Sequence, residues 1–304
     1  MTTTLSPKQF LRKNLIEGIA NRQMELDLDF INMFSVTYTD NVSVTYHEDL
    51  TTAGDDIDSG VTGEPIDLGE LSELPTVEIS PITQKSGMLR PFGLQMKVSE
   101  RDMKRSEIVN DLMRATERIA YVMGRKVNND IVSKFQNTTN DITEVDGSAV
   151  WSLDTADPIK DIINFKKAFH VTGFGSKLTD LYLHTDNYSE LEQYMVGIDR
   201  NWAISPRGEE EVPRLRGVAI HEIDNTSEVA EGSYLGFDTR PSFKPMDIYA
   251  YRPEGFSADP SFRMINVYRY KEQQYPHNEV VEFVGETLYA IKKPNSFCYK
   301  SSGI

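Results

Sequence analysis

The stretch SERDMKRSEIVNDLMRATERIAYVMGRKVNNDIVSKF, residues 99 to 135, decides the fold class because it predicts one unusually long helix. Ser99 and Asp102 have the spacing of a capping box, and apolar residues then recur every three or four positions from Ile108 to Ile131. Such a helix would be about 50 Å long. Because the apolar spacing does not keep a heptad repeat, we expect a strut across one domain and not a coiled coil.

A strongly acidic stretch precedes this helix. Residues 46 to 75, YHEDLTTAGDDIDSGVTGEPIDLGELSELP, carry nine carboxylates and neither lysine nor arginine. No basic residue occurs between Arg22 and Lys85, so most of the net charge of −15 is concentrated there. The stretch has no apolar core of its own. It is either a solvated, self-repelling loop or a segment that contacts a basic surface on another chain. It cannot itself supply the cationic face that sequence-independent nucleic-acid binding needs.

The segments before the long helix predict a helical arm and several strands. Apolar spacing predicts a short helix over residues 7–19, followed by a polar stretch over 20–29, and this arm needs another surface to dock on. Strands are expected within 30–38, 42–46, 76–82 and 91–98, with a turn at Lys85 to Gly87.

The segments after the long helix alternate between helices and strands. Asp157-Pro158 opens a second helix, LYLH at 181–184 is a buried strand, and a capped helix follows from about Asp186. LRGVAIHEI and GSYLGFD are expected to form a pair of strands. FRMINVYRY and NEVVEFVGETLYAIKKP suggest a hairpin or an edge pair. The order of elements indicates an α+β or α/β protein.

The search for catalytic motifs is negative. The sequence contains no GxSxG, HExxH, GxxxxGK[ST] or GxGxxG motif. Cys298 is the only cysteine, which excludes an internal disulfide, and it is interpreted as a small apolar residue. Glu286 lies in an apolar strand, where we expect its side chain to be solvated or bonded to a neighbour. The five histidines show no ligand spacing and are expected at the surface or at strand ends: His47, His170, His184, His221 and His277.

No catalytic residue, cofactor or metal site is predicted. Asp55, Asp56 and Asp58 are the best candidates for cation ligands, but their spacing does not fit an EF-hand loop. No apolar run is long enough to span a membrane, and the first residues lack the continuous apolar stretch of a signal peptide.

The order of these parts resembles the Hong Kong 97-type major capsid protein of tailed double-stranded DNA viruses. Local phrases carry the resemblance over nearly the whole chain: GEPIDLGELSELPTVEI at 63–79, LQMKVSERDM at 94–103, RIAYVMGRKVNNDIV at 118–132, DPIKDIINFKKAFHVTGFGSKLTDLYLHTDNYSELEQYM at 157–195, RLRGVAIHEI at 214–223, GSYLGFD at 232–238 and EVVEFVGETLYAIKKPNSF at 279–297.

The resemblance implies an α+β fold of the Hong Kong 97-like capsid type with four parts. These are an N-terminal arm at 1–42, an extended loop at 43–76, a peripheral domain at 77–150 and 262–304 with the spine helix at 99–135, and an axial domain at 151–261.

The resemblance also implies a major capsid protein that self-assembles as hexamers and pentamers into an icosahedral shell around the viral double-stranded DNA. The extended loop would lie over a neighbouring copy. Candidate residues of this subunit interface are Asp55, Asp56, Asp58, Glu64 and Asp67 on the loop and Lys85, Arg90, Arg101, Lys104 and Arg105 as basic partners. Such a protein is not an enzyme. It is found in the virion after synthesis in the host cytoplasm, without contact to a membrane.

Departures from the family pattern lead to further expectations. Residues 43 to 76 contain no lysine, so we expect no covalent lysine–asparagine crosslink between subunits, although Glu286 occupies a position comparable to the family's acidic helper. The helical arm begins within about ten residues of Met1, which favours a separate scaffolding protein. A portal protein and a decoration protein are further partners that the family implies.

Two alternatives remain from the sequence. An encapsulin-type nanocompartment shell has the same fold and packages an enzyme instead of a genome. A protein of a different class would be a metal-dependent enzyme that uses Asp55, Asp56, Asp58 and a histidine.

Overall fold

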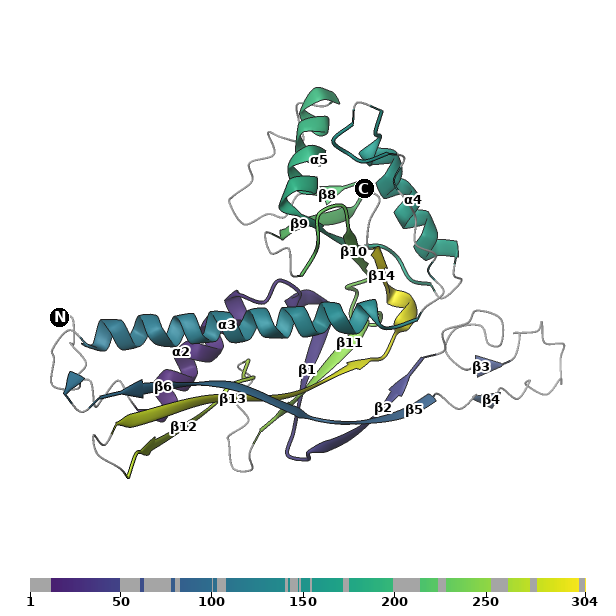
Figure 1. Cartoon of the computed structure of the whole chain (residues 1–304). Helices are drawn as coiled ribbons and strands as arrows, with labels where there is room; N and C mark the ends of the chain where they lie inside the picture. Colours follow the sequence, from purple (N-terminus) through teal and green to yellow (C-terminus); the bar gives the residue numbers. More distant parts are fainter. Residues whose placement is uncertain are drawn as a thin grey trace, which may run out of the picture.

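The computed structural model shows two five-stranded sheets and one long helix that lies along the first sheet (Figure 1). It describes residues 12–49, 61–62, 78–79, 83–99, 101–102, 108–139, 142, 147, 149–153, 155–171, 175–198, 214–223, 228–252, 262–273, 278–300 and 304. The helices are α2 (Lys13–Leu26), α3 (Ile108–Gln136), α4 (Pro158–Val171) and α5 (Thr185–Ile198), with short 3₁₀ turns at Ile31–Met33 and Pro294–Ser296.

The strands fall into four groups. The first sheet contains β1 (Phe34–Thr39), β6 (Arg90–Val98), β11 (Met246–Tyr251), β12 (Asn266–Lys271) and β13 (Glu279–Ile291). The second sheet contains β7 (Asp180–His184), β8 (Arg214–Leu215), β9 (Val218–Ile223), β10 (Tyr234–Phe237) and β14 (Phe297–Lys300). Two separate ribbons pair β2 (Ser43–Glu48) with β5 (Thr83–Met88) and β3 (Val61–Thr62) with β4 (Glu78–Ile79).

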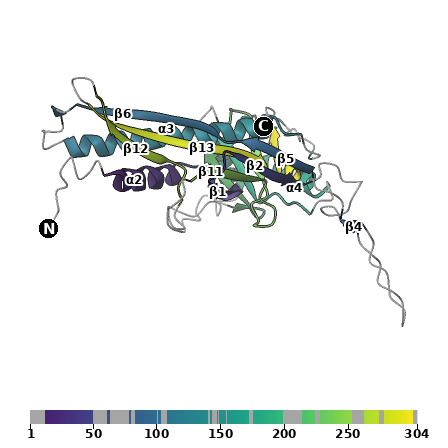
Figure 2. The ribbon, with the colours of Figure 1, turned by 90° about the horizontal axis from the view of Figure 1, so that it is seen from below.

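The long strand β13 organises the first sheet. Its residue Thr287 pairs with Arg90 of β6 and with Ala250 of β11, so these two strands lie on opposite edges of β13. β12 forms an antiparallel hairpin with the first half of β13, which confirms the hairpin expected from the sequence. β1 pairs in parallel with β11 at the far edge. Seen from below, the strands of this sheet lie in front of α3 (Figure 2).

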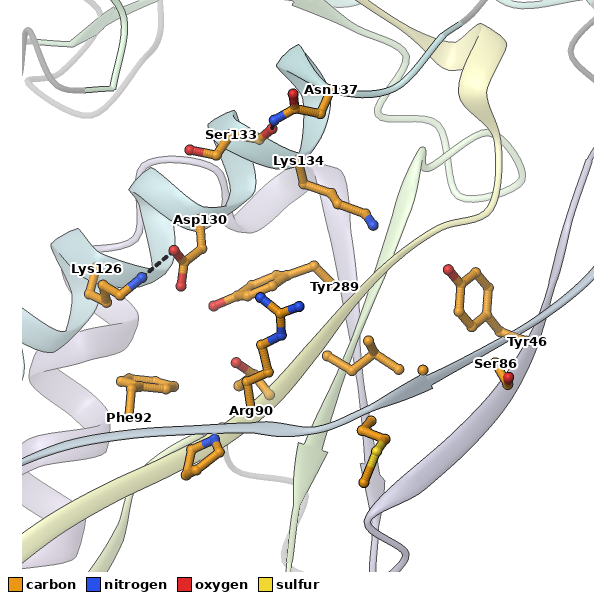
Figure 3. Close-up of a pocket in the computed structure, with 15 residues that line it drawn as sticks. Tyr46, Ser86, Arg90, Phe92, Lys126, Asp130, Ser133, Lys134, Asn137 and Tyr289 are labelled. Atoms are coloured by element: carbon orange, nitrogen blue, oxygen red, sulfur yellow. Dashed lines mark hydrogen bonds and ion pairs between the residues drawn. The ribbon is translucent and has the colours of Figure 1, made fainter.

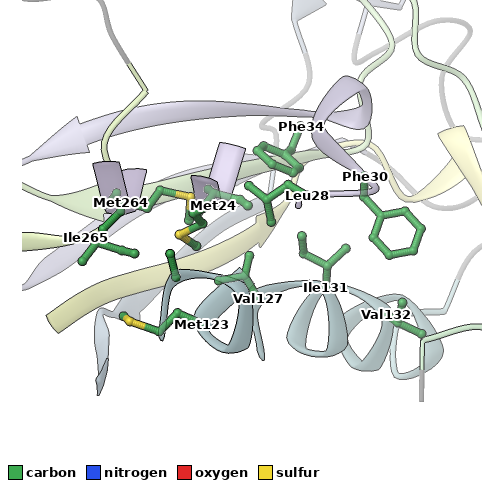
Figure 4. Packing of buried hydrophobic residues seen from close by; sticks show 14 of the residues in the cluster. Met24, Leu28, Phe30, Phe34, Met123, Val127, Ile131, Val132, Met264 and Ile265 are labelled. Carbon is green, nitrogen blue, oxygen red and sulfur yellow. The ribbon is translucent and has the colours of Figure 1, made fainter. Parts of the chain in front are cut away.

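The apolar stripe predicted on the long helix is confirmed. Ala120, Val127 and Ile131 of α3 are fully buried against α2 and the first sheet (Figure 4). The described helix begins at Ile108 and not at residue 99, and residues 103–107 lie outside the described part. The capping contact itself is present, because the Asp102 N–H donates to the Ser99 Oγ at 3.1 Å.

The N-terminal helix ends later than expected and is part of the core, and its expected start at residue 7 lies outside the described residues. α2 continues to Leu26 through the segment that the sequence suggested was a polar stretch. Asn21 is buried there because its side chain donates to the Ile265 carbonyl at 2.9 Å and accepts the Met264 and Ile265 N–H groups. Polar residues can therefore occupy the inner face of this helix where the chain supplies hydrogen-bond partners.

The second sheet corrects one prediction of pairing. β9 and β10 were expected to pair with each other, but β7 lies between them in the order β14-β10-β7-β9-β8. The segment LRGVAIHEI forms its own hairpin of β8 and β9, turning at Arg216 and Gly217, which both have positive φ. α4 begins at Pro158 as predicted, and the Asp157 Oδ1 caps it by accepting the Lys160 N–H at 3.1 Å. α5 begins at Thr185, as predicted to within one residue.

Strand pairing also departs from the sequence expectation at three other places. The turn expected at Lys85 to Gly87 is wrong, since these residues lie inside β5 and pair with β2. β11 belongs to the first sheet although it lies within 151–261, and β14 belongs to the second sheet although it lies within 262–304. Each sheet therefore takes a strand from beyond the boundary that the sequence indicated.

An aromatic cluster joins the end of α3 and the segment before β1 to the second sheet. Phe135 packs against Phe237 and Phe297 of the second sheet at ring distances of 5.1 and 4.4 Å. Phe30 packs against Tyr182 at 5.1 Å. The long helix is therefore buried against the first sheet along its length and against the second sheet at its end. No helix among the described residues is both long and apolar enough to cross a membrane.

We predict that Gly93→Ala destabilises the protein. The added Cβ would lie 2.3 Å from the Phe283 backbone oxygen on the neighbouring strand β13, which cannot move without breaking the pairing. We expect a loss of roughly 1–3 kcal/mol, seen as a lower midpoint of urea unfolding. Gly18→Ala in α2 is the control, because no atom lies within 4 Å of the new methyl group and alanine favours a helix by roughly 0.5–1 kcal/mol. Equal shifts in the two variants would contradict the prediction.

Candidate functional site

The root of the extended loop is held to the body of the protein by charged contacts. The strands β2 and β5 pair antiparallel, with Glu48 opposite Thr83. Lys85 forms an ion pair with Glu48, and the Asp49 N–H donates to the Lys292 carbonyl at 2.7 Å. Lys293 reaches the Asp49 carboxylate at 2.8 Å. These contacts fix the direction in which the ribbon leaves the body, and β3 and β4 lie well beyond its end (Figures 1 and 2).

A groove of about 820 Å³ lies beside this root, between α3 and the strands β5, β6 and β13 (Figure 3). Helix residues form one wall and strand residues form the other. The lining residues are Tyr46, Ser86, Gly87, Met88, Arg90, Pro91, Phe92, Lys126, Asp130, Ser133, Lys134, Asn137, Thr287, Leu288 and Tyr289. Gly87 has a steric role here, since a Cβ at this position would meet the Leu288 side chain at 2.7 Å.

The groove carries an excess of positive charge in a protein that is strongly acidic overall. Arg90, Lys126 and Lys134 line it against a single carboxylate, Asp130, which leaves a formal charge of +2. Lys126 and Asp130 form an ion pair one helical turn apart. Arg90 and Lys134 have no carboxylate partner among the residues that the structure describes. The groove is therefore suited to an acidic segment.

One residue that lines the groove, Tyr289, has a buried hydroxyl group. The Tyr289 hydroxyl is enclosed, and it meets no acceptor at good geometry within the described part of the chain. Burial raises the pKa of Tyr289, with the Thr287 side chain opposing this rise and Asp130 adding to it. The group is therefore protonated at neutral pH.

The structure locates three of the ten interface residues proposed from the sequence. Arg90 lines the groove, Lys85 pairs with Glu48 of its own chain, and Arg101 is exposed just before α3. The other seven lie outside the described residues: Asp55, Asp56, Asp58, Glu64, Asp67, Lys104 and Arg105. Sequence reasoning missed Lys126, Lys134 and Tyr289. The 3.6-residue period could have placed the two lysines on one flank of the helix, but nothing local places that flank beside β6.

A carboxylate–histidine pair lies in the second sheet, away from the groove. The His221 Nε2 is 2.8 Å from the Asp180 Oδ1, and the Thr239 hydroxyl donates to the Asp180 Oδ2 at 2.5 Å. Tyr182 stacks on the His221 ring at 4.3 Å. Because the hydroxyl bonds to the carboxylate and not to the imidazole, this is not the order of a nucleophile, base and acid. It is a hydrogen-bonded network that holds β7, β9 and the segment after β10 together.

The other residues that the sequence singled out have structural positions, except His277, which lies outside the described residues. His47 and His170 are exposed and His184 ends β7, as expected, whereas His221 lies inside β9. Cys298 is buried in β14, which agrees with its interpretation as a small apolar residue. Glu286 is only partly buried in β13. Among the described residues, no three His, Cys, Asp or Glu side chains gather as a metal site.

Comparison with known proteins finds similarity in structure alone. No family model and no curated protein matches this chain. The virus-like particle from Pyrococcus furiosus is similar at a TM-score of 0.56 and 11% identity, covering 94% of this chain and 97% of that one. The capsid of a native GTA particle is similar at a TM-score of 0.58 and 12% identity, covering 90% of this chain and 89% of that one. The capsid of Myoviridae phage XM1 is similar at a TM-score of 0.53 and 12% identity, covering 89% of this chain and 90% of that one.

These similarities identify the class of fold. The chain has the α+β fold of Hong Kong 97-like capsid shells, over nearly its whole length, as the resemblance in its sequence predicted. Its structural neighbours are mostly phage capsids.

Asp180→Asn should lower stability in a pH-dependent way. Burial alone would raise the pKa of Asp180, but hydrogen bonds from His221, Thr239 and Thr179 outweigh it and lower the pKa below the ordinary 3.8. The charged form therefore stabilises the fold above that pH, and the contribution is lost as pH falls through the folded pKa. We expect the free energy of unfolding, measured in urea at pH 7, to be roughly 1–3 kcal/mol higher for the wild type than for D180N. This difference should shrink below about pH 4.

The exposed Asp40 provides the control for this experiment. Asp40→Asn makes the same chemical change at an exposed position, where little loss of stability is expected. A D180N deficit that stays constant from neutral to acidic pH would show that the charge of Asp180 does not stabilise the fold.

Proposed function

We propose that this protein is the major capsid protein of a tailed double-stranded DNA virus, a shell subunit that assembles as hexamers and pentamers around the genome. The observation that carries the proposal is the match of nearly the whole chain to capsid subunits, with 89–90% of each chain covered for phage XM1 and the native GTA particle. The structural neighbours are shell proteins and not enzymes, which favours a structural role.

The acidic loop and the groove support a contact between copies. The ribbon of β2 and β5 starts beside the groove and leads away from the body (Figure 1). Residues 46 to 75 carry nine carboxylates, and the groove has a formal charge of +2. In the assembled shell, the loop of one copy lies over its neighbour and its carboxylates meet Arg90 and Lys134 there.

Other parts of the proposal follow from the family resemblance. The arm, loop, peripheral and axial parts act as the four units of the subunit, with a separate scaffolding protein, a portal protein and a decoration protein as partners. The chain is a component of the virion, made in the host cytoplasm. Subunits are joined without covalent crosslinks, because residues 43 to 76 contain no lysine.

An encapsulin-type shell is the second candidate, and one observation favours keeping it. The virus-like particle from Pyrococcus furiosus has a TM-score of 0.56, close to the 0.58 of the native GTA capsid. Fold similarity therefore does not distinguish the two kinds of shell. The material that the shell encloses, nucleic acid or a protein cargo, would distinguish them. The metal-dependent enzyme rests on Asp55, Asp56 and Asp58, which lie outside the described residues, and gains no support from the groove.

Electron microscopy of the purified protein tests the proposal directly. We expect closed particles or regular capsomers that contain nucleic acid when isolated from cells. Denatured particles should run on a gel as one band near 34.5 kDa, because no covalent link joins the subunits. A protein cargo in place of nucleic acid would favour the encapsulin, a ladder of larger bands would contradict the absence of crosslinks, and a permanently monomeric protein would refute the shell.

We also predict that Arg90→Gln with Lys134→Gln weakens assembly. Each exposed ion pair contributes roughly 0.2–1 kcal/mol, so the concentration needed for assembly should rise roughly 2- to 30-fold. High salt should also raise the concentration that the wild type needs for assembly, since it screens exposed charges. Lys160→Gln with Lys167→Gln on α4 removes the same charge from an exposed site and should have little effect. Light scattering measures the assembly of all three proteins. Equal assembly of the two variants would show that the groove does not contribute to the contact between copies.

A further inference from the structure

The first half of α3 exposes a basic stripe on the flank that does not contact the sheet. Arg114, Arg118, Tyr121 and Arg125 are spaced four, three and four residues apart, so they lie on one side of the helix over about 16 Å. Arg114 and Arg118 are exposed, and Tyr121 is 46% exposed. The guanidinium group of Arg125 lies over the Tyr121 ring at 5.8 Å from its centre, a cation–π contact within the stripe.

The two leading arginines differ from the basic residues on the strands. Lys97 pairs with Glu272 and Arg269 pairs with Glu279, so each of these two strand cations has a neighbouring carboxylate. Asp111 and Glu117 flank the stripe on the same helix, yet neither forms an ion pair with Arg114 or Arg118 among the described residues. A chain with a net charge of −15 thus keeps two adjacent guanidinium groups available to an external anion.

The pattern fits a phosphate-bearing polymer better than a protein helix. A helical partner would need a continuous apolar seam, but Glu117 interrupts the row between Met113 and Tyr121. The exposed apolar residues Met113 and Val122 are nine positions apart and so lie on opposite flanks. Arginine binds phosphate in a planar, two-pronged geometry, and an exposed aromatic ring adds a contact that does not depend on sequence.

The stripe and the groove lie on different flanks of the same helix. Asp130, in the wall of the groove, follows Arg114 by sixteen positions, which turns it about 160° away around the helix axis. A neighbouring copy whose loop occupies the groove therefore leaves the stripe uncovered. This separation allows one helix to serve a subunit contact on one side and a second partner on the other.

We propose that Arg114, Arg118 and Tyr121 contact the phosphodiester backbone of the enclosed duplex DNA without reading its sequence, with Arg125 as a positioning residue for Tyr121. The inference rests on the proposed function, because it names the surface that a genome-enclosing shell presents to its DNA. It also places the exposed flank of α3 toward the enclosed volume.

The test is a salt titration of DNA binding by the full-length protein. Wild type and the variant Arg114→Gln with Arg118→Gln are co-sedimented with a mixed-sequence duplex of a few hundred base pairs over a range of salt concentrations. Loss of two phosphate contacts should reduce the slope of log K against log salt by about 2 and weaken binding at the lowest salt by roughly tenfold or more. Lys160→Gln with Lys167→Gln, which makes the same change in net charge, should keep the wild-type slope.

Each other outcome overturns the inference. An unchanged slope in the arginine variant, an equal loss in the lysine control, or no binding by the wild type would remove the stripe as a DNA contact. Competition by polyglutamate as strong as by DNA would assign the stripe to an acidic protein, and loss of particles with unchanged DNA binding would assign it to contact between copies. Particle formation by the wild type tests the proposed function separately, so failure of the one is distinguishable from failure of the other.

Discussion

The burial of one face of α3 is the interaction on which the rest of the structure depends. Along its length the helix packs on α2 and on the sheet organised by β13, and at its end Phe135 enters the aromatic cluster of the second sheet. Because a single helix contributes to both contacts, the two sheets are held in a fixed relation by one element. The hydrophobic effect on this one face therefore stabilises the positions of parts that are far apart in the sequence.

The flanks of α3 that remain outside this packing carry its charges. One flank lines the groove with Lys126, Asp130 and Lys134, and the other carries the arginine stripe. The acidic residues are concentrated elsewhere in the sequence, in the stretch between β2 and β5. This separation of opposite charges within one chain is the basis of the proposed contact between the acidic loop of one copy and the basic groove of its neighbour.

The candidate site could be predicted only in part from the sequence. The acidic stretch and Arg90 were recognisable because charge is visible without a structure. Lys134 and Tyr289 were not, because α3 and β13 are separated by more than a hundred residues and only packing brings them to one groove. Lys85 has a contact that its charge alone did not reveal, because antiparallel pairing of β2 and β5 places it beside Glu48 of its own chain.

The sequence by itself determined the elements whose signals are local. Periodicity predicted the buried stripe of α3, Asp157-Pro158 predicted the start of α4, and two alternating runs predicted the hairpin of β12 and β13. Only the tertiary structure decided that β7 separates β9 from β10, that β1 pairs with β11, and that α2 continues through a polar segment. The physical reason is that these choices depend on hydrogen bonds and burial between distant segments, such as those of Asn21 with residues 264 and 265, which no local pattern encodes.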